Sequence, residues 1–207
     1  MKEDLVYNII KKGKIMDKDK ETQVELTGIK GTWNEVLNKA RITVHKEEIK
    51  KEPSDDFKRK ILRAEHSPIR SLIFCFKIIN LKSWVATHFA RHHIGIEKWI
   101  RTQRTDRTGI NRDELSQGNR VEMEIEANTQ ALINISRKRL CNQASKETRQ
   151  VMEKIKNEVA KKDNFVAEVM VKECIYRGFC PEMQSCGYDK TEQFKKELEE
   201  YRKTKGE

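Results

Sequence analysis

Two short basic segments in the middle of the chain carry residue types that suit anion binding. Arg91-His92-His93 comes first, and Arg101-Thr-Gln-Arg104-Thr-Asp-Arg107 begins eight residues after it. The three arginines of the second segment recur every three residues, so on a helix they share one face. A guanidinium group donates hydrogen bonds in a planar fork that suits phosphate and carboxylate groups, and threonine hydroxyls add neutral donors. The pattern indicates an anion or nucleotide site, with a solvated basic helix as the alternative.

A second polar group begins at Asn128 and continues through Gln130, Asn134, Arg139 and Gln143. On an unbroken helix turning about 100° per residue, Asn128, Arg139 and Gln143 lie within roughly 60° of one another and span about 22 Å. That length is sufficient to lie along an extended dinucleotide. Neutral amides beside one arginine suit the edges of a flavin or pyrimidine ring, which offer both donors and acceptors. The alternative is an ordinary amphipathic helix with a polar outer face.

Three of the five cysteines, Cys174, Cys180 and Cys186, are spaced six residues apart near the end of the sequence. Three thiols and a fourth ligand from elsewhere are a possible zinc site, but the spacing is not that of common zinc knuckles and no histidine is near. We therefore expect reduced structural cysteines in a compact turn and no metal site.

The elements that position these residues follow from hydrophobic periodicity and capping signals. We expect strands over 5–10, 22–29, 72–79 and 121–125, with the apolar run 72–79 at the centre of the sheet. Helices are expected over 32–40 and 54–63, with Thr32 and Ser54 as N-caps, and over 83–91, 128–142 and 147–162. In the last of these, Val151, Ile155 and Val159 form a core-facing stripe. Residues from about 190 to 207 are expected to form a solvated or frayed helix.

Composition restricts the class of protein. Charged residues make up 37% of the 207, and 43 Lys+Arg against 33 Asp+Glu give a net charge of +10, which favours a polyanionic partner. The longest apolar run is far shorter than the ~20 residues of a membrane helix, and the first residues contain no apolar signal segment. We expect a soluble, cytoplasmic protein with one domain over 1–207. The expected fold class is α/β (α+β), a mixed or antiparallel sheet packed against helices.

Taken together, the two polar groups resemble the flavin-dependent thymidylate synthases (the ThyX class), from about Glu65 to Arg149. The family signature is Arg-His-Arg, seven residues, Ser, one residue and Arg. Arg91-His92-His93 stands for its first half, and Thr105 and Arg107 stand for its second half. Eleven residues, 94–104, separate the halves here, and four extra residues are about one helical turn, so both halves are expected to keep the same direction.

The resemblance also assigns roles to individual residues. Arg139 is expected at the edge of the uracil ring, where its positive charge stabilises the charge that builds up when C5 becomes nucleophilic, and no protein nucleophile is needed. Substitutions relative to the family are Gln103 for Glu, His93 for the third motif arginine and Gln143 for His. The residues expected to bind FAD are Ser67, Arg91, His92, His93, Ile94, Gln103, Asn128, Gln130 and Asn134. Those expected to bind dUMP are His88, Arg91, Gln103, Thr105, Arg107 and Arg139.

The implied activity is FAD-dependent conversion of dUMP to dTMP, with methylenetetrahydrofolate and NADPH as co-substrates, in a homotetramer whose sites combine several subunits. Only twenty residues separate Arg107 from Asn128, an interval that is several times longer in the family and supplies another phosphate-binding arginine. Arg112 and Arg120 are candidates to replace it. Two alternatives stay open: a related flavoenzyme that modifies another pyrimidine nucleotide, and a small basic nucleic-acid-binding protein. Acidic residues within the basic region, and no recognised DNA-binding motif, count against the latter.

Overall fold

The computed structural model describes residues 21–203, so the strand expected over 5–10 lies outside the described residues. Its centre is a four-stranded antiparallel sheet in the order β1-β2-β4-β3. The strands are β1 (Gln23–Lys30), β2 (Ile73–Lys82), β3 (Ile96–Ile100) and β4 (Arg120–Asn128). The expected central position of the apolar strand is confirmed, because β2 pairs with β1 on one side and with β4 on the other.

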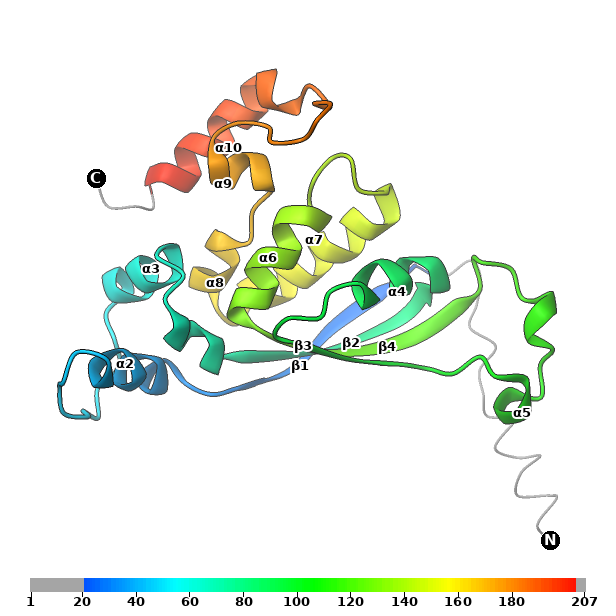
Figure 1. The fold of residues 1–207 in the computed structure, drawn as a ribbon, viewed down its shortest axis with the longest axis horizontal. Helices are drawn as coiled ribbons and strands as arrows, with labels where there is room; N and C mark the ends of the chain where they lie inside the picture. Colours follow the sequence, from blue (N-terminus) through cyan, green and yellow to red (C-terminus); the bar gives the residue numbers. More distant parts are fainter. Residues whose placement is uncertain (1–20, 204–207) are drawn as a thin grey trace, which may run out of the picture.

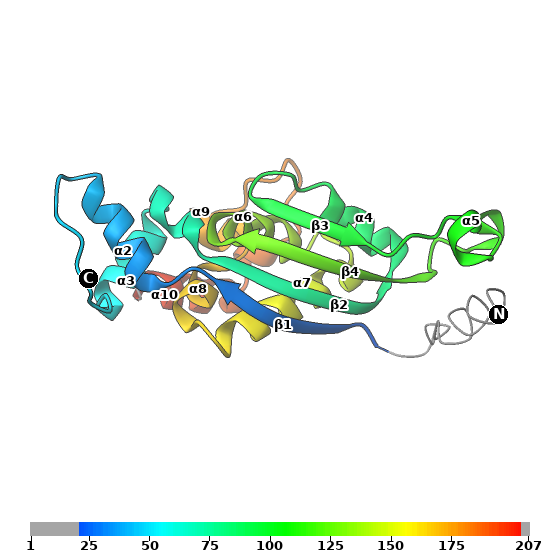
Figure 2. The same cartoon turned by 90° about the horizontal axis from the view of Figure 1, so that it is seen from below.

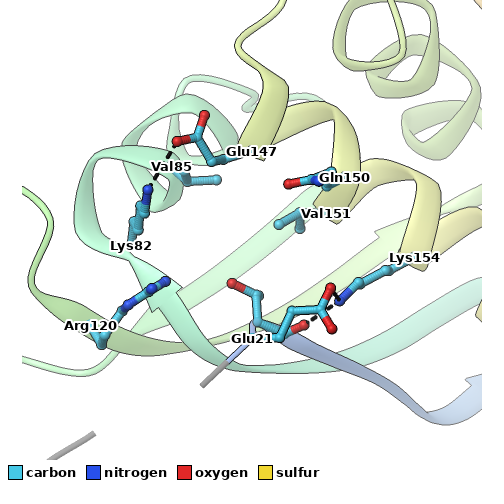
Figure 3. Close-up of a pocket in the computed structure, with 9 residues that line it drawn as sticks. Glu21, Lys82, Val85, Arg120, Glu147, Gln150, Val151 and Lys154 are labelled. Atoms are coloured by element: carbon cyan, nitrogen blue, oxygen red, sulfur yellow. Dashed lines mark hydrogen bonds and ion pairs between the residues drawn. The ribbon is translucent and has the colours of Figure 1, made fainter. Parts of the chain in front are cut away.

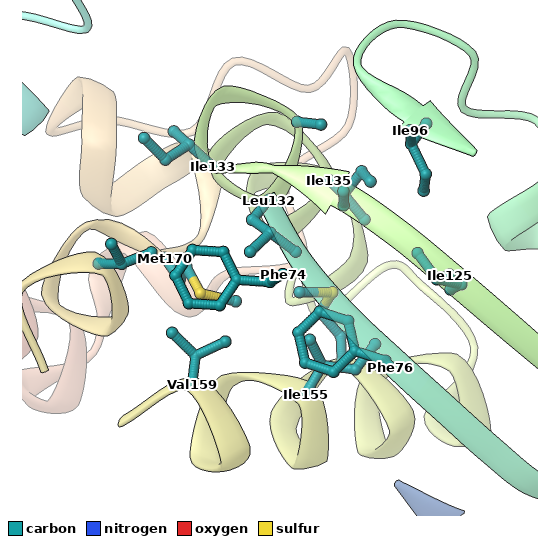
Figure 4. Packing of buried hydrophobic residues seen from close by; sticks show 14 of the residues in the cluster. Phe74, Phe76, Ile96, Ile125, Leu132, Ile133, Ile135, Ile155, Val159 and Met170 are labelled. Carbon is teal, nitrogen blue, oxygen red and sulfur yellow. The ribbon is translucent and has the colours of Figure 1, made fainter. Parts of the chain in front are cut away.

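Helices cover only one face of this sheet (Figure 1). They are α4 (Ser83–Ala90), α6 (Thr129–Arg139), α7 (Lys146–Ala160) and α8 (Asn164–Val169). Alternate side chains of β2, such as Phe74 and Phe76, point into the core and meet Leu132 of α6 and Ile155 of α7 (Figure 4). The predicted stripe on α7 is confirmed, since Val151, Ile155 and Val159 are all buried.

The opposite face of the sheet carries mostly polar side chains and is not covered by any described helix (Figure 2). Glu25, Lys77, Glu124 and Trp99 lie side by side across the four strands. Trp99 is 53% exposed. Antiparallel sheets commonly keep one solvated face in this way, and the alternation of apolar and polar residues along β1 and β4 follows from it.

The helices before the central strand begin at the predicted caps. Thr32 caps α2 (Trp33–Ile42) by accepting from the N–H of Glu35, and Ser54 caps α3 (Asp55–Arg63) by accepting from the N–H of Phe57. A 3-10 turn, η1 (Ser67–Ser71), then leads into β2. These segments join the hydrophobic core through Val36, Ile61 and Leu62. Trp33 Nε1 also donates to Asp163 Oδ2 at 2.8 Å.

The chain ends in α9 (Glu173–Arg177), a 3-10 turn η3 (Tyr188–Lys190) and α10 (Glu192–Lys203). The sequence predicts a solvated or frayed helix here, and over 192–203 the helix is docked rather than frayed. Phe194 is 5% exposed and packs edge-on against Tyr188, while the Arg63 guanidinium lies 3.9 Å from the centre of the Tyr201 ring. Within residues 21–203, no helix combines the length and apolarity needed to cross a bilayer.

One helical prediction is wrong. The helix that begins after Asn128 stops at Arg139, with Leu140 as its C-cap, so Gln143 does not share a helical face with Asn128. The basic segment does not form the single helix that was the alternative to an anion site, because β3 ends at Ile100 and α5 (Thr105–Thr108) is a single turn. Arg101 pairs with Glu122 at 2.8 Å, and Arg104 pairs with Asp106 at 2.8 Å.

Candidate functional site

A short loop between α4 and β3 contains the first half of the motif and is tied to the start of α6. The N–H of Asn128 donates to the carbonyl of Gly95 at 2.9 Å. Gly95 has φ +71, and a Cβ there would lie 2.5 Å from Nδ2 of Asn128. Only glycine combines that backbone conformation with so close an approach. The loop 91–95 is therefore fixed against the helix that carries the second polar group.

At the other end of α6, Arg139 closes a small polar cluster with this loop and with α4. Its Nε donates to Nε2 of His92 at 3.0 Å, and its Nη2 donates to the carbonyl of His88 at 2.6 Å. The Nδ1 of His88 is 2.8 Å from the hydroxyl of Thr148, which is fully buried on α7. The structure thus brings Arg139 together with His88 and His92, two residues of the predicted site that lie 51 and 47 residues before it in sequence. We call His88, His92 and Arg139 the Arg139 cluster.

The charge state of the cluster follows from its burial. Burial lowers the pKa of His92 to about 4, and the positive charges of Arg139, Lys98 and His93 act in the same direction. Burial and the neighbouring Arg91 also lower the pKa of Arg139, which nonetheless stays protonated. His92 is therefore neutral at pH 7 and accepts from the guanidinium. Two of the five N–H donors of Arg139 are used in this way.

The first turns of α6 display the predicted amides. Asn128 is the N-cap of the helix, because its Oδ1 accepts from the N–H of Ala131 at 2.9 Å. Gln130 donates to Oδ1 of Asn134 at 3.3 Å and also to the Glu65 carboxylate. Asn134 is exposed. These side chains can donate and accept beside a planar, polar ring system.

Glu65 is a site residue that sequence reasoning missed. Its carboxylate accepts from Gln130 and forms an ion pair with Arg137, and its φ is +51. The Arg137 guanidinium stacks on the Tyr176 ring, 3.5 Å from its centre. A positive φ at a glutamate has no sequence signal, so only the tertiary structure shows that Glu65 orients the polar face of α6.

The remaining FAD candidates lie near this face. Ser67 begins η1, which packs against α6, and its side chain is exposed. Arg91 and His93 are exposed in the loop, and Ile94 is 88% exposed.

The second half of the motif lies elsewhere. Thr105 and Arg107 belong to α5, which Figures 1 and 2 place beyond the end of the sheet and away from α6. Gln103 precedes α5, and its Nε2 is buried without a hydrogen bond to any described residue. The expectation that both halves keep the same direction within one chain is wrong. The residues between the two halves include the extended strand β3. A strand advances about 3.3 Å per residue, so the second half lies far from the first.

Arg120, a candidate replacement for the missing phosphate ligand, lines a different pocket of about 190 Å³ (Figure 3). The pocket lies at the end of the sheet where β1 begins and β2 ends. Lys82 pairs with Glu147 at 2.9 Å and Lys154 pairs with Glu21 at 2.7 Å, so carboxylates offset the charges of both lysines. No residue of the Arg139 cluster lines this pocket.

Comparison with known proteins gives similarity at the level of the fold. No protein-family model matches the chain, and no curated protein matches it in sequence. Among solved structures, the UMP/dUMP methylase PolB from Streptomyces cacaoi, bound with 5-Br dUMP, has a TM-score of 0.59 at 15% identity, covering 77% of this chain and 96% of that chain. Thymidylate synthase X (ThyX) from Helicobacter pylori with FAD and dUMP has a TM-score of 0.61 at 12% identity, covering 73% of this chain and 100% of that chain. A second complex of the H. pylori enzyme with FAD and dUMP has a TM-score of 0.59 at 13% identity, covering 72% and 100%.

The fold of this chain is therefore that of the ThyX-like proteins. The expected mixed or antiparallel sheet packed against helices is confirmed, and the sheet is antiparallel.

The lowered pKa of His92 predicts a loss of stability in mild acid. Because the folded-state pKa lies below the ordinary value of 6.5, the unfolded chain takes up a proton first as the pH falls. Above about pH 6.5, the titration of His92 does not reduce the free energy of unfolding. Between pH 6.5 and pH 4 it lowers that free energy, by at most about 3 kcal/mol. Chemical denaturation across this range measures it. His92→Gln, which keeps an acceptor for Arg139 but does not titrate, should show a flatter profile, and an unchanged profile would contradict this origin.

Proposed function

We propose that this protein is an FAD-dependent thymidylate synthase, which converts dUMP to dTMP with methylenetetrahydrofolate as the one-carbon donor and NADPH as the source of reducing equivalents. The observation that carries the proposal is the Arg139 cluster. A partly buried guanidinium is held at one end of a helix whose other end displays amide side chains, in a fold shared with proteins that bind FAD and dUMP.

The donor set around α6 fits a flavin dinucleotide. Asn128, Gln130 and Asn134 offer neutral donors and acceptors, and Arg91 offers an exposed positive charge beside them for the diphosphate. Ser67, His92, His93 and Ile94 complete the proposed contacts. Flavin supplies the hydride when bound, and the protein binds and orients it.

Arg139 is proposed as the catalytic residue. His92 and the carbonyl of His88 hold its guanidinium in one orientation, and three N–H donors remain for a uracil edge. A fixed charge in a partly desolvated site stabilises developing negative charge more strongly than the same charge in water. Neutral His92 contributes by holding Arg139 without competing for a substrate anion.

The site of one chain is incomplete, and we propose that another copy completes it. Gln103, Thr105 and Arg107, the expected dUMP contacts, lie on the segment around α5, away from the Arg139 cluster (Figure 2). This segment projects beyond the sheet, and the uncovered face of the sheet exposes Trp99. A homotetramer, in which α5 of one subunit reaches the α6 of another, accounts for both features.

A second candidate function is methylation of another pyrimidine nucleotide, such as UMP. The similarity to a UMP/dUMP methylase favours it. So does the position of Arg120, which donates to the carbonyl of Asn80 at 3.2 Å in the separate pocket and so does not extend the Arg139 cluster.

The first test is flavin binding. We expect the purified protein to be yellow or to bind added FAD, and Arg91→Ala to weaken FAD more than tenfold, because a charge-assisted contact is worth roughly 1.5–3 kcal/mol. Calorimetry measures both affinities. Arg41→Ala, which removes a half-buried arginine on α2, is the control. Equal affinity of Arg91→Ala and the wild type would remove Arg91 from the site.

Arg139→Lys separates binding from chemistry. Lysine keeps the charge but lacks the planar fork, so we expect FAD to be retained while dTMP formation falls by ~10²-fold or more, comparable to the loss of a preorganised donor. The assay follows dUMP-dependent flavin oxidation together with dTMP. Lys138→Ala, an exposed neighbour on α6, is the control. Undiminished dTMP formation in Arg139→Lys would refute its role, and methylation of UMP but not dUMP by the wild type would select the second candidate.

Mixing two inactive variants tests the shared site. Subunits with Arg107→Ala and subunits with Arg139→Lys should each be impaired, but reassembled mixtures should regain activity because some sites take an intact residue from each chain. Light scattering should give a multiple of the 24.4 kDa chain mass, with four expected. A mixture no more active than its parts, or an active monomer, would contradict the proposal.

A further inference from the structure

Four of the five cysteines gather around one small cavity that the proposed reaction does not use. Cys141 lies in the turn after α6, Cys174 lies on α9, and Cys180 and Cys186 lie in the loop between α9 and η3. Sequence spacing pointed to the last three, and the fold adds Cys141, which is 33 residues before Cys174 in the chain. The fifth, Cys75, is on β2 in the sheet.

Backbone turns place these thiols. Gly178 ends α9 in the left-handed conformation with φ +83, and the reversed chain then reaches Cys180. Gly187, with φ +80, follows Cys186 directly and turns the loop into η3. The side-chain amide of Gln143 donates to the carbonyl of Gln184 and so joins the turn of Cys141 to the loop of Cys186.

The size and lining of the cavity indicate which kind of ligand fits it. Its volume is about 10 Å³, which holds one small ion or water but no organic ligand. The residues around the thiols include Glu173, Glu182 and Asp189, and Glu173 is paired with Arg177. Four sulfurs from separate turns, with no histidine among the lining residues, form the donor set that tetrahedral Zn²⁺ takes in structural sites.

We propose that Cys141, Cys174, Cys180 and Cys186 form a structural Zn²⁺ site. Within residues 21–203, no three side chains of metal-ligating type already converge on one point. Binding therefore turns the thiols inward between staggered χ1 rotamers, and the coordinating thiols release their protons to solvent. A disulfide would use only two of the four sulfurs and needs an oxidant.

The ion would add to the contacts that already join α6 to the C-terminal segment, such as the stacking of Arg137 on Tyr176. Cys141 is two residues from Arg139, and the other three ligands belong to the C-terminal segment that includes α9. Zinc at this position fixes the end of α6 against that segment. The site is structural, and its test does not depend on the flavin reaction.

The test measures metal rather than activity. The full chain is produced with Zn²⁺ in the medium and dialysed against a weak chelator, and its zinc and free thiols are counted by mass spectrometry and thiol titration. We expect one Zn²⁺ per chain in the wild type and in Cys75→Ser, the matched control. Cys141→Ser and Cys174→Ser each remove a proposed ligand. Each should lower the affinity for Zn²⁺ by more than roughly 10–100-fold, which is the cost of removing a residue that only hydrogen-bonds to a metal ligand.

A second measurement uses only the wild type, so it remains informative when a variant does not fold. Titration of the metal-free wild type with Co²⁺ should produce the visible absorption of tetrahedral thiolate coordination, and added Zn²⁺ should remove it. A wild type that retains no zinc, titrates five free thiols and gives no Co²⁺ band overturns the proposal. Loss of two thiols to a disulfide in the metal-free, freshly purified chain also overturns it, as does equal zinc in Cys141→Ser.

Discussion

The hydrogen bond from Arg139 to His92 is the interaction on which the geometry of the candidate site depends. It joins the end of α6 to the loop that follows α4, 47 residues away in sequence. The bond forms only while His92 is neutral, because a protonated imidazole has no acceptor for a guanidinium. Burial and the neighbouring charges of Arg139 and Lys98 keep it neutral. The same surroundings that could bind an anion therefore keep their own arginine in place.

Two further contacts extend this constraint along α6. At its start, Asn128 caps the helix and lies against Gly95, so the helix and the loop cannot shift independently. On its outer face, Glu65 holds Gln130 and Arg137. The polar side chains of α6 are thus fixed from both ends and from one flank, as preorganised binding groups must be.

Local patterns predicted the parts of the fold that local physics determines. Short-range signals were sufficient for the N-caps Thr32 and Ser54. They were also sufficient for the apolar run of β2 and for the apolar stripe of α7, in which every fourth residue is buried. No strand is predicted over β3, because five residues are too few to show a period and Trp99 and Ile100 are exposed. The end of α6 was placed too late because no glycine or proline follows Arg139 to mark it.

The candidate site could be predicted as a set of residues but not as an arrangement. The resemblance named His88, His92 and Arg139, whereas their mutual hydrogen bonds exist only through tertiary contact. The displacement of Thr105 and Arg107, the role of Glu65 and the addition of Cys141 to the other thiols all depend on where the chain runs between distant segments. None of these has a signature in composition or periodicity.

The sheet topology also determines how the chain must fold. Gln23 pairs with Ile79 and Ile73 pairs with Asn128, so the central strand finds partners 56 and 55 residues away (79 − 23 and 128 − 73). Even Ile100 and Met123, an edge pair, are 23 residues apart (123 − 100). The described strands are not joined by short hairpins, so each pairing must close a long loop. The chain loses the entropy of loop closure before the hydrogen bonds between strands compensate for it. Folding is consequently expected to be slow for a chain of this size, with the edges of β2 exposed until both neighbours arrive.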